Sequence, residues 1–268
     1  MNYLADLRAV ELEILSEVLR ICKKHSIQYY LLGGTLLGAV RHQGFIPWDD
    51  DIDISMPRKD YNRFLRIASK ELDSKYFLQC YFTDERHCLR HSKIRKNNTL
   101  FIEDSNTRDM SSHHGIFIDI FPLDYAHRND GIQTFQRKLA VLCEIMIMIK
   151  QDDTRKGIKK WICKLFSYKF LHTIQNISMS LVKNGDYIVS LASKYDTSRE
   201  TFPANYYSSG TYLKFETYSL CVPLNYDGVL RTVFGDNYME LPPLENRESH
   251  FPTRLSFDTN GPDAFIEN

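Results

Sequence analysis

One stretch of the chain, residues 31–57 (LLGGTLLGAVRHQGFIPWDDDIDISMP), constrains the possible fold more than any other. It joins a pair of glycines to an acidic segment that alternates with isoleucine. Because successive side chains of a strand point to opposite faces, Asp51 and Asp53 are predicted to share one face, while Ile52 and Ile54 enter the core. Two carboxylates on one face repel each other unless a cation lies between them or one stays protonated.

The acidic segment therefore predicts a metal site. Asp49, Asp50 and Asp51 run directly into an apolar strand that also carries Asp53, and burying that charge without a cation would be costly. Carboxylate oxygens are hard ligands, which suit Mg²⁺ or Mn²⁺, and these ions usually also bind substrate phosphates. The alternative is an ordinary solvated strand end, where isolated acidic residues are common.

The glycine pair predicts a phosphate-binding turn. Gly33, Gly34 and Thr35 follow an apolar run, and a turn without side chains lets backbone N–H groups approach a phosphate beside a helix N-terminus. Thr35 is predicted to be the N-cap of a short helix over residues 36–42. The alternative interpretation is a simple turn, which is what most Gly-Gly pairs form.

A calcium-binding loop is the sharpest rival for the acidic segment. Asp49, Asp51, Asp53 and Ser55 alternate like the first ligands of an EF-hand. The sixth position of that loop needs glycine for its sharp turn, and here it is Ile54. The sequence therefore favours a strand that carries a magnesium-type site.

A second informative stretch, residues 115–124 (GIFIDIFPLD), is apolar on both faces except at Asp119. A single carboxylate in a buried strand needs a partner. We interpret Asp119 as a third carboxylate that completes the metal site and accepts a proton from an incoming hydroxyl. A structural carboxylate bonded to backbone or arginine is the alternative.

Composition excludes several classes of protein. The chain has 268 residues with 34 basic and 34 acidic side chains, and this balance argues against a nucleic-acid partner. We expect neither a signal peptide nor a membrane-spanning helix. The six cysteines lack zinc-like spacing and are predicted to be reduced, which favours a cytoplasmic protein.

Hydrophobic periodicity predicts helices over residues 3–25, 58–72 and 226–234, a strand over 28–32, and mainly helix from 129 to 194. Residues 155–172 are basic, without an acidic side chain, and carry an apolar face that includes Ile158, Trp161 and Leu165. This segment could lie on an anionic membrane surface. We prefer a helix that packs its apolar face on the core, because any surface helix needs such a face.

The stretch from residue 31 to residue 64 resembles the signature of the LicD family, the phosphorylcholine transferases, which is related to fukutin-type proteins and to the wider nucleotidyltransferase fold. The resemblance continues through HSKIRKNNTLFIE, GIFIDIFPLD and LNYDGVLRTVFGDNYMELPP, and then to Arg247 and His250. One departure is visible at Gln43, where many members carry a basic residue. Arg41 and His42 beside it remain.

The resemblance implies an α+β (α/β) nucleotidyltransferase-like core, with a short mixed sheet flanked by helices and a helical insertion. We expect a catalytic core over residues 1–128, a helical region over 129–200, strands and a helix completing the core over 201–252, and a polar, disordered tail over 253–268. The resemblance also implies transfer of phosphocholine from CDP-choline to a hydroxyl of a cell-surface glycan precursor, of the teichoic acid or lipopolysaccharide type. CMP is the other product.

Further residues follow as candidates for the substrate. Arg41, His42, Lys93 and Arg95 are predicted to contact phosphates. A choline group needs an aromatic cage, for which Trp48 is a candidate beside Phe45, Tyr61 and Tyr125. We expect a lipid-linked acceptor and peripheral contact with the cytoplasmic membrane. The alternatives are transfer of a nucleoside monophosphate from an NTP to a small molecule or RNA, and a non-catalytic nucleotide- or glycan-binding protein.

Overall fold

The computed structural model of the chain describes residues 3–103, 112–127, 130–247 and 252–259. Its helices are α1 (Tyr3–His25), α2 (Gly33–His42), α3 (Arg58–Glu71), α4 (Asp130–Gln151), α5 (Ile158–Lys164), α6 (Tyr168–Met179) and α7 (Tyr226–Phe234). Its strands are β1 (Tyr30–Leu31), β2 (Asp53–Pro57), β3 (Tyr76–Gln79), β4 (Ser92–Lys96), β5 (Leu100–Ile102), β6 (Phe117–Ala126), β7 (Tyr187–Val189), β8 (Thr201–Pro203), β9 (Gly210–Phe215), β10 (Tyr218–Pro223) and β11 (Arg254–Ser256).

The main sheet is mixed and has β6 at its centre. Its strand order is β1-β2-β6-β4-β3, and only the β2–β6 pair is parallel among the pairs that the structure describes. The far end of β6 turns to pair with β7, which pairs in turn with β8. This arrangement confirms the expected α+β, nucleotidyltransferase-like fold.

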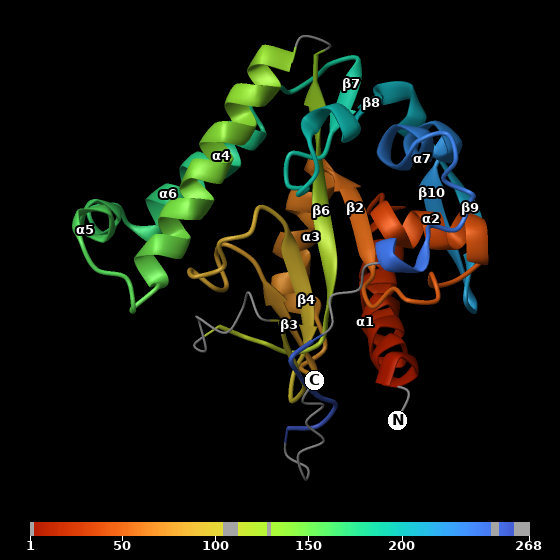
Figure 1. The fold of residues 1–268 in the computed structure, drawn as a ribbon, viewed down its shortest axis with the longest axis horizontal. Helices are drawn as coiled ribbons and strands as arrows, with labels where there is room; N and C mark the ends of the chain where they lie inside the picture. Colours follow the sequence, from red (N-terminus) through yellow and green to blue (C-terminus); the bar gives the residue numbers. More distant parts are fainter. Residues whose placement is uncertain (1–2, 104–111, 128–129, 248–251, 260–268) are drawn as a thin grey trace.

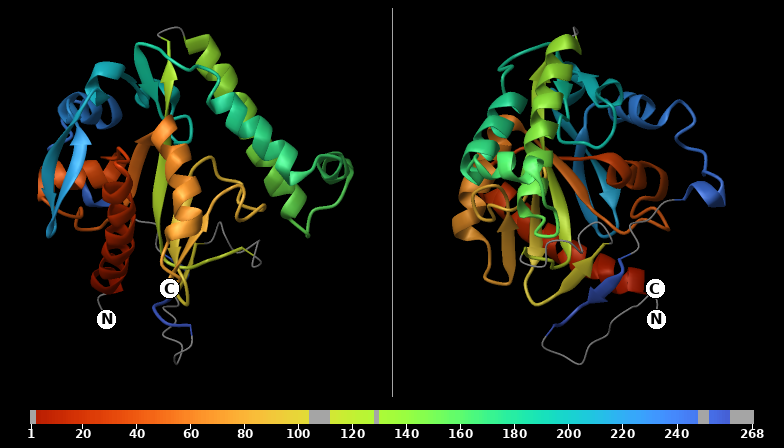
Figure 2. Two further views of the ribbon diagram at one scale, coloured as in Figure 1. Left: turned by 180° about the vertical axis from the view of Figure 1, so that it is seen from behind. Right: turned by 60° about the vertical axis from the view of Figure 1, so that its left-hand side comes forward.

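Helices α1 and α3 cover one face of the sheet (Figures 1 and 2). The apolar stripe of α1, which includes Leu7, Ile14 and Val18, is fully buried, and so are Ile54 of β2 and Ile120 of β6. Burial of such a stripe against a sheet is the main source of stability for a surface helix. The site lies on the opposite face of the sheet, which we call the open face.

Two further units flank the sheet. On one side α2 and α7 lie with the β9–β10 hairpin, as Figure 1 shows. On the other side α4 and α6 pack against each other and carry α5 at their outer end. We call α4, α5 and α6 the helical arm.

The structure corrects several expected boundaries. Strand β2 begins at Asp53, so Asp51 lies in the loop before it rather than in the strand. Helix α2 begins at Gly33 with Leu32 as N-cap, so Thr35 lies inside the helix and does not cap it. The expected helix to residue 194 ends at Met179, because the next segment supplies β7 to the sheet.

Two other predictions are corrected by burial and pairing. The basic segment does not pack its apolar face on the core: Ile158 is 73% exposed and Trp161 is 61% exposed. The tail from residue 253 is structured in part, because β11 pairs with β5 and buries Leu255 completely. The remainder of that tail, residues 260–268, and His250 lie outside the described residues.

Candidate active site

The floor of the site is built by the two parallel strands β2 and β6. Their register places Asp53 directly opposite Asp119, so the two carboxylates rise from the same face of the sheet. The backbone N–H of Asp119 also donates to the carbonyl of Ile52 at 2.9 Å, which extends the pairing to the loop that carries Asp51. All three carboxylates line one pocket on the open face.

Asp53 carries a charge that its protein neighbours do not compensate. The residue as a whole is partly exposed, but its Oδ1 is buried and has no hydrogen-bond partner. Burial raises the pKa of Asp53 well above its usual range, and the nearby carboxylates of Asp51 and Asp119 raise it further. A buried carboxylate in this environment is stabilised either by a proton or by a cation.

Asp119 is compensated by the protein itself. The ammonium of Lys93 lies 2.7 Å from its Oδ1, and the Nε2 of His91 lies 3.3 Å from the same oxygen. Burial acts to raise the pKa of Asp119, but Lys93 and His91 outweigh it and hold that pKa below its usual value. His91 is itself held by stacking on Phe121, with ring centroids 4.3 Å apart.

The donor atoms fit a hard divalent cation in part. Asp51 and Asp53 offer carboxylate oxygens, and the buried Oδ1 of Asp53 needs a positive partner. Among the described residues, however, no three His, Cys, Asp or Glu side chains already gather around one point as metal ligands would. The arrangement therefore fits Mg²⁺ or Mn²⁺ held by Asp51 and Asp53 and completed by substrate oxygens, which is the usual way that Mg²⁺ binds. The role of Asp119 as a third ligand stays a prediction.

The first residues of α2 lie close to the carboxylates of Asp49 and Asp53. Gly33 has φ +55°, and a Cβ there would lie 3.3 Å from the Oδ2 of Asp53. A Cβ on Gly34 would lie 2.8 Å from the Oδ2 of Asp49, so a larger residue would force a shift. The helix N-terminus, with its unpaired N–H groups, thus faces the pocket.

Thr35 holds the start of α2 next to β2. It is buried, and its Oγ1 accepts a hydrogen bond of 2.8 Å from the backbone N–H of Asp53. Its hydroxyl therefore holds β2 against α2 and does not line the pocket. The predicted phosphate contact uses the backbone N–H of Thr35, which lies in the first turn of α2, and it stays a prediction.

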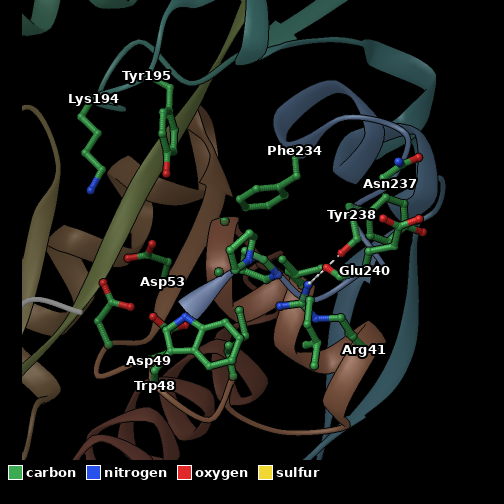
Figure 3. Close-up of a pocket in the computed structure, with 18 residues that line it drawn as sticks. Arg41, Trp48, Asp49, Asp53, Lys194, Tyr195, Phe234, Asn237, Tyr238 and Glu240 are labelled. Atoms are coloured by element: carbon green, nitrogen blue, oxygen red, sulfur yellow. Dashed lines mark hydrogen bonds between the residues drawn. The ribbon is translucent and has the colours of Figure 1, made fainter. Parts of the chain in front are cut away.

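Two pockets meet at the carboxylates. The tryptophan pocket, about 570 Å³, is lined by Gly34, Arg41, Trp48, Phe234 and Tyr238, among others (Figure 3). The lysine pocket, about 370 Å³, is lined by His91, Lys93, Asp119, Phe121 and Glu200, among others. Both are also lined by a shared set of residues: Gly33, Asp51, Asp53, Lys194 and Tyr195.

Lys194 and Tyr195 are site residues that the sequence did not reveal. Figure 3 shows the amine of Lys194 and the hydroxyl of Tyr195 pointing toward Asp53 from the side opposite Trp48. They follow β7, at and just after the end of the segment, residues 129–194, that hydrophobic periodicity predicts to be mainly helical. Phe234 and Tyr238 come from α7 and the loop after it, and only the motif around them in the sequence pointed to this region.

The remaining candidates are divided between the site and its surroundings. Arg41 lines the tryptophan pocket and donates to the carbonyls of Tyr238 and Glu240, while His42 beside it does not line that pocket. Arg95 is buried and donates to the carbonyl of Gly115, away from both pockets. Of the aromatic candidates, Trp48 alone lines the tryptophan pocket.

The other three aromatic candidates lie elsewhere. Phe45 and Tyr61 are buried in the core, and Tyr125 is exposed on β6 beyond the pocket. A cation already lies over Trp48, because the guanidinium carbon of Arg247 is 4.4 Å from its ring centroid. Arg247 therefore covers one face of the indole, and another cation binds this ring on its opposite face or in place of Arg247.

Known protein families and curated relatives match the part of the chain that builds this site. The family model described as LicD/FKTN/FKRP, nucleotidyltransferase domain, matches residues 26–140. The chain is 30% identical to "Lipopolysaccharide cholinephosphotransferase LicD" of Haemophilus influenzae over 267 residues, covering 92% of this chain and 95% of that protein. It is 35% identical to human "Ribitol 5-phosphate transferase FKRP" over 57 residues, which cover 21% of this chain and 12% of that protein.

Proposed function

Because the chain belongs to the LicD family of phosphotransferases, we propose that it transfers phosphocholine from CDP-choline to a hydroxyl of a cell-surface glycan precursor and releases CMP. The acceptor is a lipid-linked precursor of the lipopolysaccharide or teichoic acid type, and the reaction takes place on the cytoplasmic side of the membrane. One observation carries the proposal: two pockets share the carboxylates Asp51 and Asp53. A group transfer needs this arrangement, with donor and acceptor on either side of the reacting phosphorus.

The tryptophan pocket suits the donor. Trp48 and Phe234 offer apolar faces. Arg247 covers one face of Trp48, so a trimethylammonium group binds the opposite face, or takes the place of Arg247, by a cation–π interaction. The N-terminus of α2 favours the negative diphosphate. Lys194 and Arg41 add cations at the same pocket. Together these groups orient a choline-bearing diphosphate across Asp53.

Asp51 and Asp53 would hold Mg²⁺ or Mn²⁺, which when bound neutralises charge on the diphosphate as CMP leaves. The residues themselves place the charges. Thr35 ties the backbone of Asp53 to α2, so the carboxylate and the helix N-terminus keep a fixed distance from each other. Such preorganised groups stabilise a transition state because they need no reorganisation during the reaction.

The lysine pocket suits the acceptor hydroxyl. Lys93 keeps Asp119 ionised, and this makes the carboxylate a weak base. Asp119 therefore takes the hydroxyl proton only late in the transfer, when the new P–O bond has made that proton strongly acidic. His91 and Lys93 hold the carboxylate in position until then.

The direct test is product analysis. The purified protein is incubated with CDP-choline, Mg²⁺ and a panel of free and lipid-linked glycan precursors, and mass spectrometry detects added phosphocholine and CMP. Pyrophosphate release from an NTP, with a nucleotide on the acceptor, would instead support the nucleotidyltransferase alternative. Binding of CDP-choline without any product under all conditions would support the non-catalytic one.

A variant tests the placement of choline. Trp48→Leu removes the aromatic face but keeps an apolar side chain, so we expect the preference for CDP-choline over CDP-ethanolamine to fall about 10-fold. The ratio of the two kcat/KM values measures this preference. Tyr212→Leu, which changes an exposed aromatic residue on β9, is the matched control. An unchanged ratio in Trp48→Leu would place choline elsewhere.

A further inference from the structure

At the outer end of the helical arm, helix α5 exposes its apolar side chains and buries polar ones, the reverse of a usual surface helix. Ile158, Trp161, Ile162 and Leu165 stand three, four and seven positions apart, so they share one face of α5. They are exposed to 73%, 61%, 44% and 63% respectively. Cys163 and Lys160, on the opposite side of the helix, are buried. The helix thus turns its apolar face to solvent and packs its other face on the arm.

The inward face of α5 is held by specific contacts. The ammonium of Lys160 donates to the carbonyl of Asp152 at 2.7 Å and lies 3.3 Å from the carboxylate of Asp153. The carbonyl of Phe166, just after α5, accepts a hydrogen bond from Lys150 of α4. These contacts determine which side of α5 faces solvent. Trp161 is therefore exposed because of how α5 packs on the arm.

Cations flank the exposed apolar face. Lys159 and Lys164 are exposed on either side of it. Residues 154–185 contain no Asp or Glu but carry Arg155, Lys156, Lys159, Lys160, Lys164, Lys169 and Lys183. The whole chain has no net charge, so this excess is local. We call the surface made by Ile158, Lys159, Trp161, Ile162, Lys164 and Leu165 the α5 surface.

The α5 surface also lies away from the site. Figures 1 and 2 both place α5 at the outer end of the arm, beyond α4 and α6 and far from β2. None of the described helices is long and apolar enough to cross a bilayer. Its exposed tryptophan and flanking lysines are the combination by which a helix lies in the plane of a membrane interface.

We propose that the α5 surface binds an anionic lipid bilayer. Its apolar side chains enter the boundary between headgroups and acyl chains, and Lys159 and Lys164 contact lipid phosphates. Lipid is favoured over a protein partner because the exposed Lys159 and Lys164 flank the apolar face and residues 154–185 contain no acidic side chain. The proposal stands on this surface alone and does not depend on the transferase reaction.

The test is co-sedimentation of the full chain with vesicles, without donor or glycan. Vesicles contain either phosphatidylcholine alone or phosphatidylcholine with about 30% phosphatidylglycerol, whose negative surface potential attracts basic side chains. We expect binding to the anionic vesicles that weakens with added salt. The double variant Lys159→Gln/Lys164→Gln should lower the partition coefficient about 30-fold, because each lysine contributes a factor of about five.

Matched variants separate the α5 surface from general effects. Trp161→Ser/Leu165→Ser should abolish detectable binding, whereas Tyr212→Ser/Leu224→Ser, which changes two exposed apolar residues elsewhere, should not. Lys59→Gln/Lys70→Gln, on exposed positions of α3, is the control for charge. In Trp48→Phe, the fluorescence of the remaining Trp161 should shift to shorter wavelength with anionic vesicles.

Three results would overturn the proposal. One is equal binding by the α5 variants and their controls, and another is no binding to anionic vesicles at low salt. The third is self-association of the wild-type chain in sedimentation velocity that Trp161→Ser/Leu165→Ser removes, since the α5 surface would then join two copies. A failure of the transferase assay leaves each of these readouts unchanged, so the two proposals can be tested separately.

Discussion

The sheet and the helical arm depart from the usual distribution of polarity in opposite ways. The sheet buries charge: Lys93 and Asp119 are almost inaccessible to water, and Asp53 has a buried oxygen without a partner. The arm exposes apolar side chains, among them Phe135 of α4 and Trp161 of α5. Buried charges and exposed apolar patches are the informative exceptions in a soluble fold. Each points to an external group that would complete it, a cation with phosphates in one region and lipid in the other.

The largest expected effect comes from removing the charge of Asp53. Asp53→Asn should lower transferase activity at least about 1,000-fold, because a preorganised charge at the reacting phosphates is lost. Without metal it should raise the melting temperature. The pKa of Asp53 is raised in the folded state, so its contribution to stability is present at low pH and is lost as the pH rises through that pKa.

Thermal unfolding of the metal-free protein checks this sign. The gain from Asp53→Asn should be larger at pH 8 than at pH 4, and the exposed control Asp6→Asn should change little at either pH. Near-normal turnover in Asp53→Asn would contradict the proposed metal site. A lower melting temperature at pH 8 would show instead that the protein itself compensates this carboxylate.

A second prediction concerns the buried ion pair between Lys93 and Asp119. Lys93→Met leaves Asp119 buried without its closest cation, and breaking such a pair costs about 3–5 kcal/mol of the free energy of unfolding. The lowered pKa of Asp119 contributes stability at neutral pH that is lost as the pH falls. That loss in the wild-type protein lies below the ordinary carboxyl pKa of about 4. In Lys93→Met the buried Asp119 lacks this cation and its pKa is raised, so the deficit should be greatest at pH 7 and should shrink toward pH 4, where Asp119 takes up a proton.

Urea unfolding at the two pH values measures this deficit. The double variant Lys93→Met/Asp119→Asn removes both charges, so it should recover much of the loss at pH 7. If the single and double variants were equally unstable, the cost would come from packing against Phe117, whose ring centroid lies 3.4 Å from the Lys93 nitrogen. The comparison thus separates charge from packing at this position.

The sequence predicts well where local pattern decides the structure. The helices over 3–25 and 226–234 are found with the predicted bounds, because their apolar spacing and flanking residues agree. Alternation also places the carboxylates of Asp53 and Asp119 on the open face, and the pairing of β2 with β6 brings them together. That pairing is a long-range contact, which the sequence did not predict; only the convergence of Asp119 with Asp51 and Asp53 was predicted.

Prediction fails where one pattern fits two environments. An apolar stripe at helical spacing is equally consistent with a face on the core and a face toward solvent, so the orientation of α5 could not be derived. Thr35 is a good N-cap by type, but only the structure shows that the backbone of Asp53 uses its hydroxyl. Lys194 and Tyr195 reach the site through the β6–β7 pairing, for which the sequence has no local signal.

The smallest expected effect concerns the exposed side of the arm. Leu142 of α4 is 52% exposed, whereas Leu15 of α1 is fully buried, and both lie inside long helices. Alanine at either position keeps helix propensity favourable, so the two variants differ mainly in lost burial. Leu15→Ala should cost about 2–5 kcal/mol of the free energy of unfolding, and Leu142→Ala less than about 0.5 kcal/mol. Chemical denaturation of both variants, in the absence of lipid, measures the difference. A large cost at Leu142 would mean that the helical arm packs this side chain in solution. The apolar surface of the arm would then not be free to bind a membrane.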